Sequence, residues 1–96
     1  MATITKNTQD RINVWKNNIP ELKNMSNDYS LLNKHRRKIY NFIMTHKYSN
    51  NKGEQAYSNN SKGHHLITLS KLIRPYNDKS SLLYSKEATN LKKSSV

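Results

Sequence analysis

The chain has 96 residues, and its 17 Lys and Arg against six Asp and Glu give a formal net charge of +11. This length supports a single domain, 1–96, and with 33% hydrophobic residues its core must be thin. The absence of cysteine excludes disulfides, thiolate chemistry and cysteine-bound zinc, and no apolar run approaches the roughly 20 residues that span a bilayer.

The first predicted element is a helix that ends near residue 18. Residues 1–7 are polar and we expect them to be loose, as we do residues 94–96 at the other end. Thr8 or Asp10 can cap the helix, because their side-chain oxygens can accept from the free N–H groups of its first turn. Three apolar residues then recur on one helical face: Ile12, Trp15 and Ile19.

Pro20 separates this helix from a shorter helical piece. Proline disfavours helical geometry at the residue before it and is well tolerated in a first turn, so a new piece should run from Pro20 to about Met25. We interpret Trp15 as an anchor of the core, and stacking of its indole on a nucleobase is the alternative.

The clearest helical pattern covers residues 29–47. Its apolar side chains cluster on one side of a helical wheel and are Leu32, Ile39, Phe42 and Ile43. A polar side holds three cations and no acid, so we expect it to contact phosphate, with an ordinary solvated helix face as the alternative. The residues of this expected contact face are Lys34, Arg37, Lys38 and Asn41.

A long polar loop is expected at about 48–64. Within it, residues 48–63 are rich in Asn, Gly and Lys and contain a near-repeat with a period of nine residues, in which Tyr-Ser-Asn-Asn occurs twice. Both glycines of the chain lie here, so a flexible loop or a small hairpin is predicted. Lys52 and Lys62 can then lie along a nucleic-acid backbone, and a tolerated duplication in an exposed loop is the alternative.

The end of the chain predicts two further elements. Residues 69–74 form a short helix that Pro75 ends, with a strand over 66–69 as the alternative, because the run is too short for its periodicity to decide. A turn over 76–78 leads to a last helix at about 81–92. Its expected apolar side holds Leu83, Tyr84, Ala88 and Leu91.

These two elements suggest a helix-turn-helix-like arrangement, in which the last helix enters a major groove. Lys79, Ser80 and Ser81 then face base edges from the N-terminal end of that helix. Further cations along the same helix, expected to bind nucleic acid as well, are Lys86, Lys92 and Lys93.

No catalytic or metal-binding motif is present. The four histidines have no Cys and no carboxylate at ligand spacing, the six acids are scattered, and no glycine-rich phosphate loop occurs. We therefore expect no enzyme activity, no metal and no cofactor.

The excess of cations over acids indicates a polyanionic partner. Abundant Lys and Asn with little Gly, Ala and Arg also follow from AT-rich coding DNA, as in a phage, a mobile element, an organelle or a low-GC bacterium. The scarcity of Asp and Glu does not follow from such DNA, so it is the stronger half of the argument.

The sequence thus predicts a small, basic, mostly α-helical domain of three to four helices that binds nucleic acid mainly through contacts of Lys and Arg with phosphate. Because Lys lacks the bidentate fork with which Arg reads guanine, binding should tolerate many sequences. DNA is favoured over RNA as the partner. The alternatives are a phage-type adaptor that binds an acidic surface of a host protein and an RNA-bound structural subunit of a ribonucleoprotein particle. We expect a reducing cytoplasmic location, or an organelle, and no membrane partner.

Overall fold

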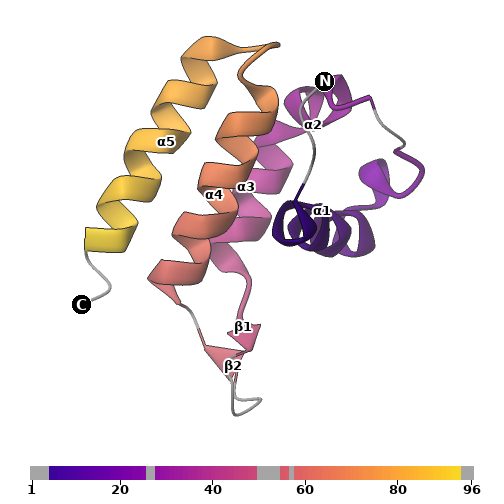
Figure 1. Cartoon of the computed structure of the whole chain (residues 1–96). Helices are drawn as coiled ribbons and strands as arrows, with labels where there is room; N and C mark the ends of the chain where they lie inside the picture. The colour runs from indigo at the N-terminus through magenta and orange to yellow at the C-terminus, as the bar shows by residue number, and fades with distance from the viewer. Residues whose placement is uncertain (1–4, 26–27, 50–54, 57, 94–96) are drawn as a thin grey trace.

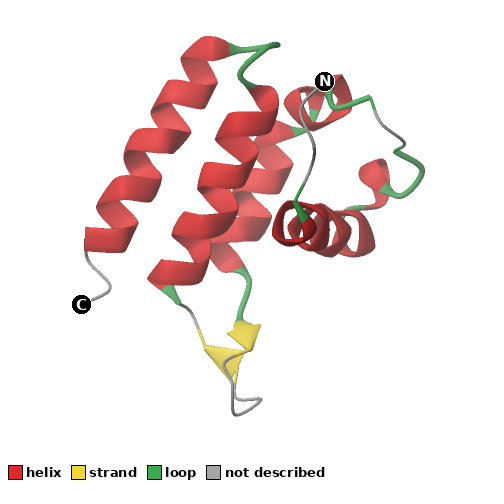
Figure 2. Cartoon of the chain, in the orientation of Figure 1, coloured by secondary structure: helices red, strands yellow, loops and turns green. Residues whose placement is uncertain are grey.

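The computed structural model describes residues 5–25, 28–49, 55–56 and 58–93. Within these residues the molecule is helical apart from a small two-stranded hairpin (Figures 1 and 2), so the prediction of a mostly α fold is confirmed. The elements are α1 Lys6–Asn18, the 3-10 turn η1 Pro20–Leu22, α2 Ser30–Lys34, α3 Arg36–Thr45, β1 Tyr48–Ser49, β2 Gln55–Ala56, α4 Asn59–Ile73 and α5 Asp78–Lys93.

The central element is α4, which packs against α1, α2, α3 and α5. In Figure 1 it runs between α5 at the left edge and α1 at the right, with α3 behind it. Because neighbours surround α4, its buried residues do not form one narrow stripe, unlike those of a surface helix. They are Gly63, His65, Leu66, Thr68, Leu69, Ser70 and Ile73.

The hydrophobic core joins α4 to the N-terminal elements and to α3. Trp15 is fully buried, which confirms its prediction as a core anchor. Pro20 separates α1 from η1, and α1 ends at Asn18 as predicted. The other fully buried large side chains are Ile12, Leu22, Leu32, Ile39, Ile43, Leu66, Leu69 and Ile73.

α4 and α5 form an antiparallel helical hairpin. Gly63, near the start of α4, lies against Ala88 and Lys92 near the end of α5. The Ser81 hydroxyl, near the start of α5, donates to the Ser70 carbonyl at 2.7 Å. The expected helix-turn-helix is not confirmed, because the helices of that motif cross at a steep angle, whereas α4 and α5 lie alongside each other.

The turn between these two helices is closed by backbone bonds. The N–H groups of Tyr76 and Asn77 both donate to the Ile73 carbonyl, at 2.9 and 2.8 Å. The Asn77 side chain then accepts from the Ser80 N–H at 3.0 Å and caps α5. The last helix therefore begins at Asp78, three residues before its predicted start, with Asn77 as its cap.

The polar loop predicted at 48–64 is wrong for residues 59–64, which form the start of α4. The Ser58 hydroxyl accepts from the Ser61 N–H and caps this helix. Residues 48–49 pair with 55–56 as antiparallel strands, which matches the small-hairpin alternative, and 50–54 and 57 lie outside the described residues. The second Tyr-Ser-Asn-Asn copy thus leads into α4, whose buried residues begin at Gly63.

Three other predicted boundaries are corrected. The single helix expected over 29–47 is divided at His35, whose φ of −105° and ψ of 20° lie outside the helical region. The Arg36 guanidinium donates a hydrogen bond to the Asn33 carbonyl at this break. The helix expected over 69–74 is helical as far as Ile73 but is the C-terminal part of the longer α4, and the strand alternative over 66–69 is wrong. The first helix starts at Lys6, because Thr5 caps it by accepting from the Thr8 N–H.

Candidate nucleic-acid interface

The outer side of α5 carries a row of lysines. Ser81 and Ala88 are buried against α4, so the opposite side of α5 faces away from the molecule. Three exposed lysines lie on that side at seven-residue intervals, which places them about 10 Å apart along the helix axis. We call these three residues the α5 lysine row: Lys79, Lys86 and Lys93.

The two carboxylates of α5 are engaged away from this row. Asp78 lies 3.6 Å from the Arg74 guanidinium, on the side of α4. Glu87 accepts a hydrogen bond of 2.5 Å from the Tyr40 hydroxyl, on the side of α3. The carboxylate of Glu87 is thus directed to α3, and that of Asp78 lies toward Arg74 at the start of α5, whereas the α5 lysine row lies on the outer side.

Contacts between α3 and α5 fix the other flank of this surface. The rings of Tyr40 and Tyr84 stack with centroids 5.4 Å apart. The hydrogen bond to Glu87, together with burial, raises the pKa of Tyr40 to about 12. Burial also raises the pKa of Tyr84, while the charges of Arg36 and Arg37 oppose that rise. Two arginines of α3 thus lie within electrostatic reach of α5.

The contact face predicted over 29–47, which the structure divides between α2 and α3, is exposed as the sequence indicated. Lys34, Arg37, Lys38 and Asn41 are all exposed side chains. Lys38, however, forms an ion pair with Glu21 of η1, so an acid from a distant segment offsets part of its charge. The sequence pattern of one helix could not show this pair.

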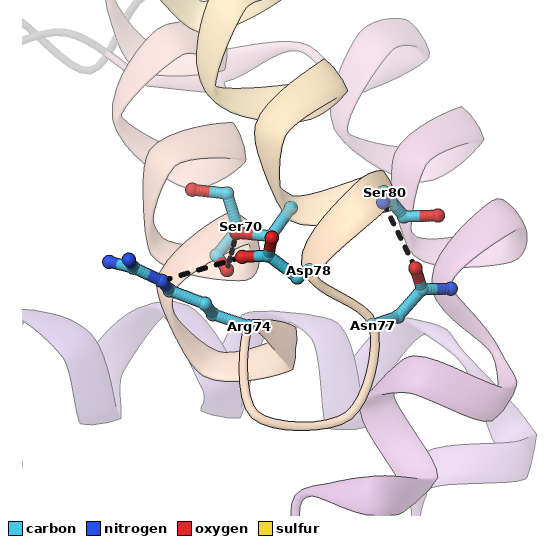
Figure 3. A network of polar contacts seen from close by, with 6 residues as sticks. Ser70, Arg74, Asn77, Asp78 and Ser80 are labelled. Carbon is cyan, nitrogen blue, oxygen red and sulfur yellow. Dashed lines mark hydrogen bonds and ion pairs between the residues drawn. The ribbon is translucent and has the colours of Figure 1, made fainter.

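A groove between α4 and α5 was not predicted. It has a volume of about 390 Å³ and opens on the side of α5 away from α3. Figure 3 shows one end of it, where Arg74, the residue after α4, reaches Asp78 of α5 beside Ser70. No local pattern marks these residues, because only the antiparallel hairpin brings them together. The groove is lined by Ile67, Ser70, Lys71, Arg74, Asp78, Ser81, Leu82 and Ser85.

Several predicted contact residues do not join this surface. Ser81 is buried, and its hydroxyl is used inside the hairpin, so it cannot face a base from the outer side of α5. Ser80 is half-buried beside its cap, and Lys62 is half-buried at the start of α4. Lys92 is exposed but lies against Gly63. Lys52 lies outside the described residues.

Positive charge is not confined to one side of the molecule. Exposed cations also occur on α1, in the segment after η1 and on α4, and include Lys6, Lys23 and Lys71. A second hollow of about 310 Å³ at the corner of α1 and η1 is lined by Lys16, Asn17, Asn18, Pro20 and Lys23. The positions of the cations alone therefore do not identify an interface. The positions of the acids relative to the cations are needed as well.

The histidines form a structural cluster. His65 is buried and accepts a hydrogen bond from the Trp15 indole. Burial lowers the pKa of His65 to about 4, and the charges of Arg11, His46 and His64 contribute to this shift. Its ring is neutral near pH 7.

In the part of the chain that the structure describes, no three His, Asp or Glu side chains gather as a metal site. No helix in that part has the length and apolar character to cross a bilayer.

Comparison with protein families, with characterised proteins and with solved structures finds no match to this chain.

Proposed function

We propose that this protein binds nucleic acid through the outer side of α5, with the α5 lysine row on the phosphate backbone. The observation that supports this most strongly is the separation of charges on α5. Its exposed lysines point outward, while Asp78 and Glu87 are turned to Arg74 and Tyr40. A row of exposed lysines attracts a polyanion and releases counterions when it binds one.

The flanks of α5 extend the same surface. Arg37 and Asn41 are exposed on α3, on one side of α5. Lys71 of α4 and Arg74, which directly follows α4, are exposed on the other. Lysines outnumber arginines among these groups, and lysine contacts phosphate as a point charge without reading a base. We therefore expect binding that depends weakly on sequence.

The test is a salt titration of nucleic-acid affinity, measured by fluorescence anisotropy. Six or more phosphate contacts predict a loss of about a thousandfold or more between about 50 and 200 mM salt. A variant with Lys79→Gln, Lys86→Gln and Lys93→Gln should flatten the slope of log affinity against log salt by about 3.

The matched control changes Lys6, Lys16 and Lys23 to Gln, which removes the same charge from the α1 side. This control should change the slope by less than about 1, because those lysines lie outside the proposed contact. Equal effects of the two triple variants would show attraction by net charge alone. A flat salt response of the native protein would remove the proposal altogether.

A second candidate is an acidic protein surface as the partner. Leu82 and Leu83 are 55% and 62% exposed beside the α5 lysine row, and a protein partner could cover them while its carboxylates meet the lysines. A pull-down with and without nuclease separates the two. A partner protein retained after nuclease treatment, and lost in the Lys79, Lys86 and Lys93 variant, supports the acidic protein.

A further inference from the structure

We propose that the groove between α4 and α5 takes one nucleotide of a single-stranded nucleic acid, with its base on the floor and its phosphate at the Lys71 and Arg74 end. This inference rests on the proposed function and specifies the kind of nucleic acid. The groove borders the proposed contact, because Leu82 lines it and is also 55% exposed beside the α5 lysine row. A strand that follows α5 thus passes the opening.

The floor of the groove offers hydrogen-bond acceptors. The Ser70 hydroxyl donates its hydrogen to the Ile67 carbonyl at 2.8 Å, and the Ser81 hydroxyl donates to the Ser70 carbonyl at 2.7 Å. Each hydroxyl has one hydrogen, so both present only lone pairs to a ligand. The Asp78 carboxylate adds acceptors at the rim. The fitting ligand therefore carries donors, as the amino and imino edges of nucleobases do.

The walls of the groove are apolar and suit the faces of a base, and one end carries cations that suit a phosphate. Ile67 and Leu82 are apolar and come from opposite helices, so a flat ring can lie against them. Lys71, in the last turn of α4, and Arg74, its C-cap, are three residues apart and both exposed, which suits a phosphate. Arg74 meets Asp78 only at 3.6 Å, with both side chains more than 70% exposed, so the pair is weak and Arg74 can turn to an anion.

The groove favours a single strand over a duplex. Its 390 Å³ lies near the lower end of the range for small-ligand sites, about 300–1,000 Å³, and suits one nucleoside. The bases of a duplex are stacked and paired, so their donor edges and faces are not free to enter a groove. A single strand can turn a base outward at little cost.

The test compares three fluorescein-labelled probes at one fixed salt concentration: a short mixed-sequence DNA strand, the same strand as RNA, and the DNA duplex. The native protein should bind the strands about tenfold more tightly than the duplex. Ser85→Trp places a bulky side chain in the groove without changing charge, and it should abolish that preference. Binding of the RNA strand, the DNA strand or both in this manner supports the proposal, and their ratio identifies the preferred sugar.

A pair of leucine variants provides a control that does not depend on the folding of the Trp variant. Leu82→Ala should weaken binding of the strand about fivefold, because Leu82 lines the groove. Leu83→Ala removes the same side chain from the next position, which does not line the groove, and should change affinity by less than about twofold. Duplex affinity should stay unchanged in both.

The experiments distinguish failure of the groove proposal from failure of the proposed function. If Ser85→Trp and Leu82→Ala leave strand binding unchanged while loss of the α5 lysine row still weakens it, the groove proposal is overturned and backbone binding stands. If neither strands nor duplex bind in a salt-dependent way, both proposals are overturned.

Discussion

The indole N–H of Trp15 donates a hydrogen bond of 3.1 Å to Nδ1 of His65, and both side chains are buried. This bond ties α1 to α4 and requires His65 to be neutral, with its hydrogen on the other ring nitrogen. Burial opposes the protonation of His65, and the charges of Arg11, His46 and His64 add to this effect.

Acidification should therefore destabilise the protein. The pKa of His65 falls from 6.5 to about 4 on folding, so the unfolded chain binds more protons between these values. Its contribution is complete above pH 6.5 and is lost as the pH falls toward 4, by at most about 3 kcal/mol. Chemical denaturation followed by Trp15 fluorescence across this range measures the loss.

The control for this prediction is His65→Gln, which keeps an acceptor for the indole and cannot take up a proton. Its free energy of unfolding should depend less on pH between about 6.5 and 4 than that of the native protein. His64, whose pKa is also lowered by burial and by Lys92 and Arg11, remains in both proteins and does not affect the difference. Identical pH profiles for the two proteins would contradict the role assigned to His65.

Removal of the Glu87 carboxylate should lower the pKa of Tyr40 from about 12 toward its ordinary value of 10. Glu87→Gln tests this, and NMR of ¹³C-labelled tyrosine separates Tyr40 from the other five tyrosines. Because the folded pKa of Tyr40 is raised, its contribution to stability is present below pH 10 and is lost as the pH rises toward 12. Tyr40→Phe should cost about 1 kcal/mol at neutral pH and remove this alkaline dependence.

Gly63 should tolerate no large side chain, because a Cβ there would lie 2.9 Å from Lys92 Cγ and 3.3 Å from the Ala88 carbonyl oxygen. Gly63→Leu should therefore push α5 away from α4 and lower the free energy of unfolding by about 2 kcal/mol. Asn60→Leu, at an exposed position of the same helix, should change it by less than about 0.5 kcal/mol. Urea denaturation of both variants makes the comparison, and equal stabilities would refute the close approach of the helices.

Ser81 and Ser80 are adjacent hydroxyls with different expected roles. Ser81→Ala removes the hydrogen bond to the Ser70 carbonyl and should cost about 1 kcal/mol of stability. Ser80→Ala should cost less than about 0.5 kcal/mol, because its backbone N–H rather than its hydroxyl bonds the Asn77 cap. Thermal unfolding measures both, and a larger loss for Ser80→Ala would overturn the assignment.

Local patterns predicted much of the helical content. The stop at Asn18 follows from Pro20, which acts on its immediate neighbour. The burial of Ile39 and Ile43 and the exposure of Arg37 follow from helical periodicity. On α5, Lys79 and Lys86 were also predicted as contact residues and are exposed.

The start of α4 was missed for a physical reason. Its first residues, 59–64, are polar and include Gly63, which resembles a loop. Ser58 is a possible signal for the start of the helix, because it caps the helix. The buried residues of α4 face several neighbouring helices, however, so they do not repeat with the period of a one-sided helix. Gly63 is needed because two helix backbones meet there and not because the chain turns.

The sequence by itself determined a helical class, a positive charge and the polar side of α3, because propensity, proline and periodicity act within a few residues. Only the tertiary structure decided which acids meet which cations, as Glu21 does Lys38, and which side chains share the groove, as Ile67 and Leu82 do. Such pairings depend on how distant helices pack, and no short segment of the chain contains that information.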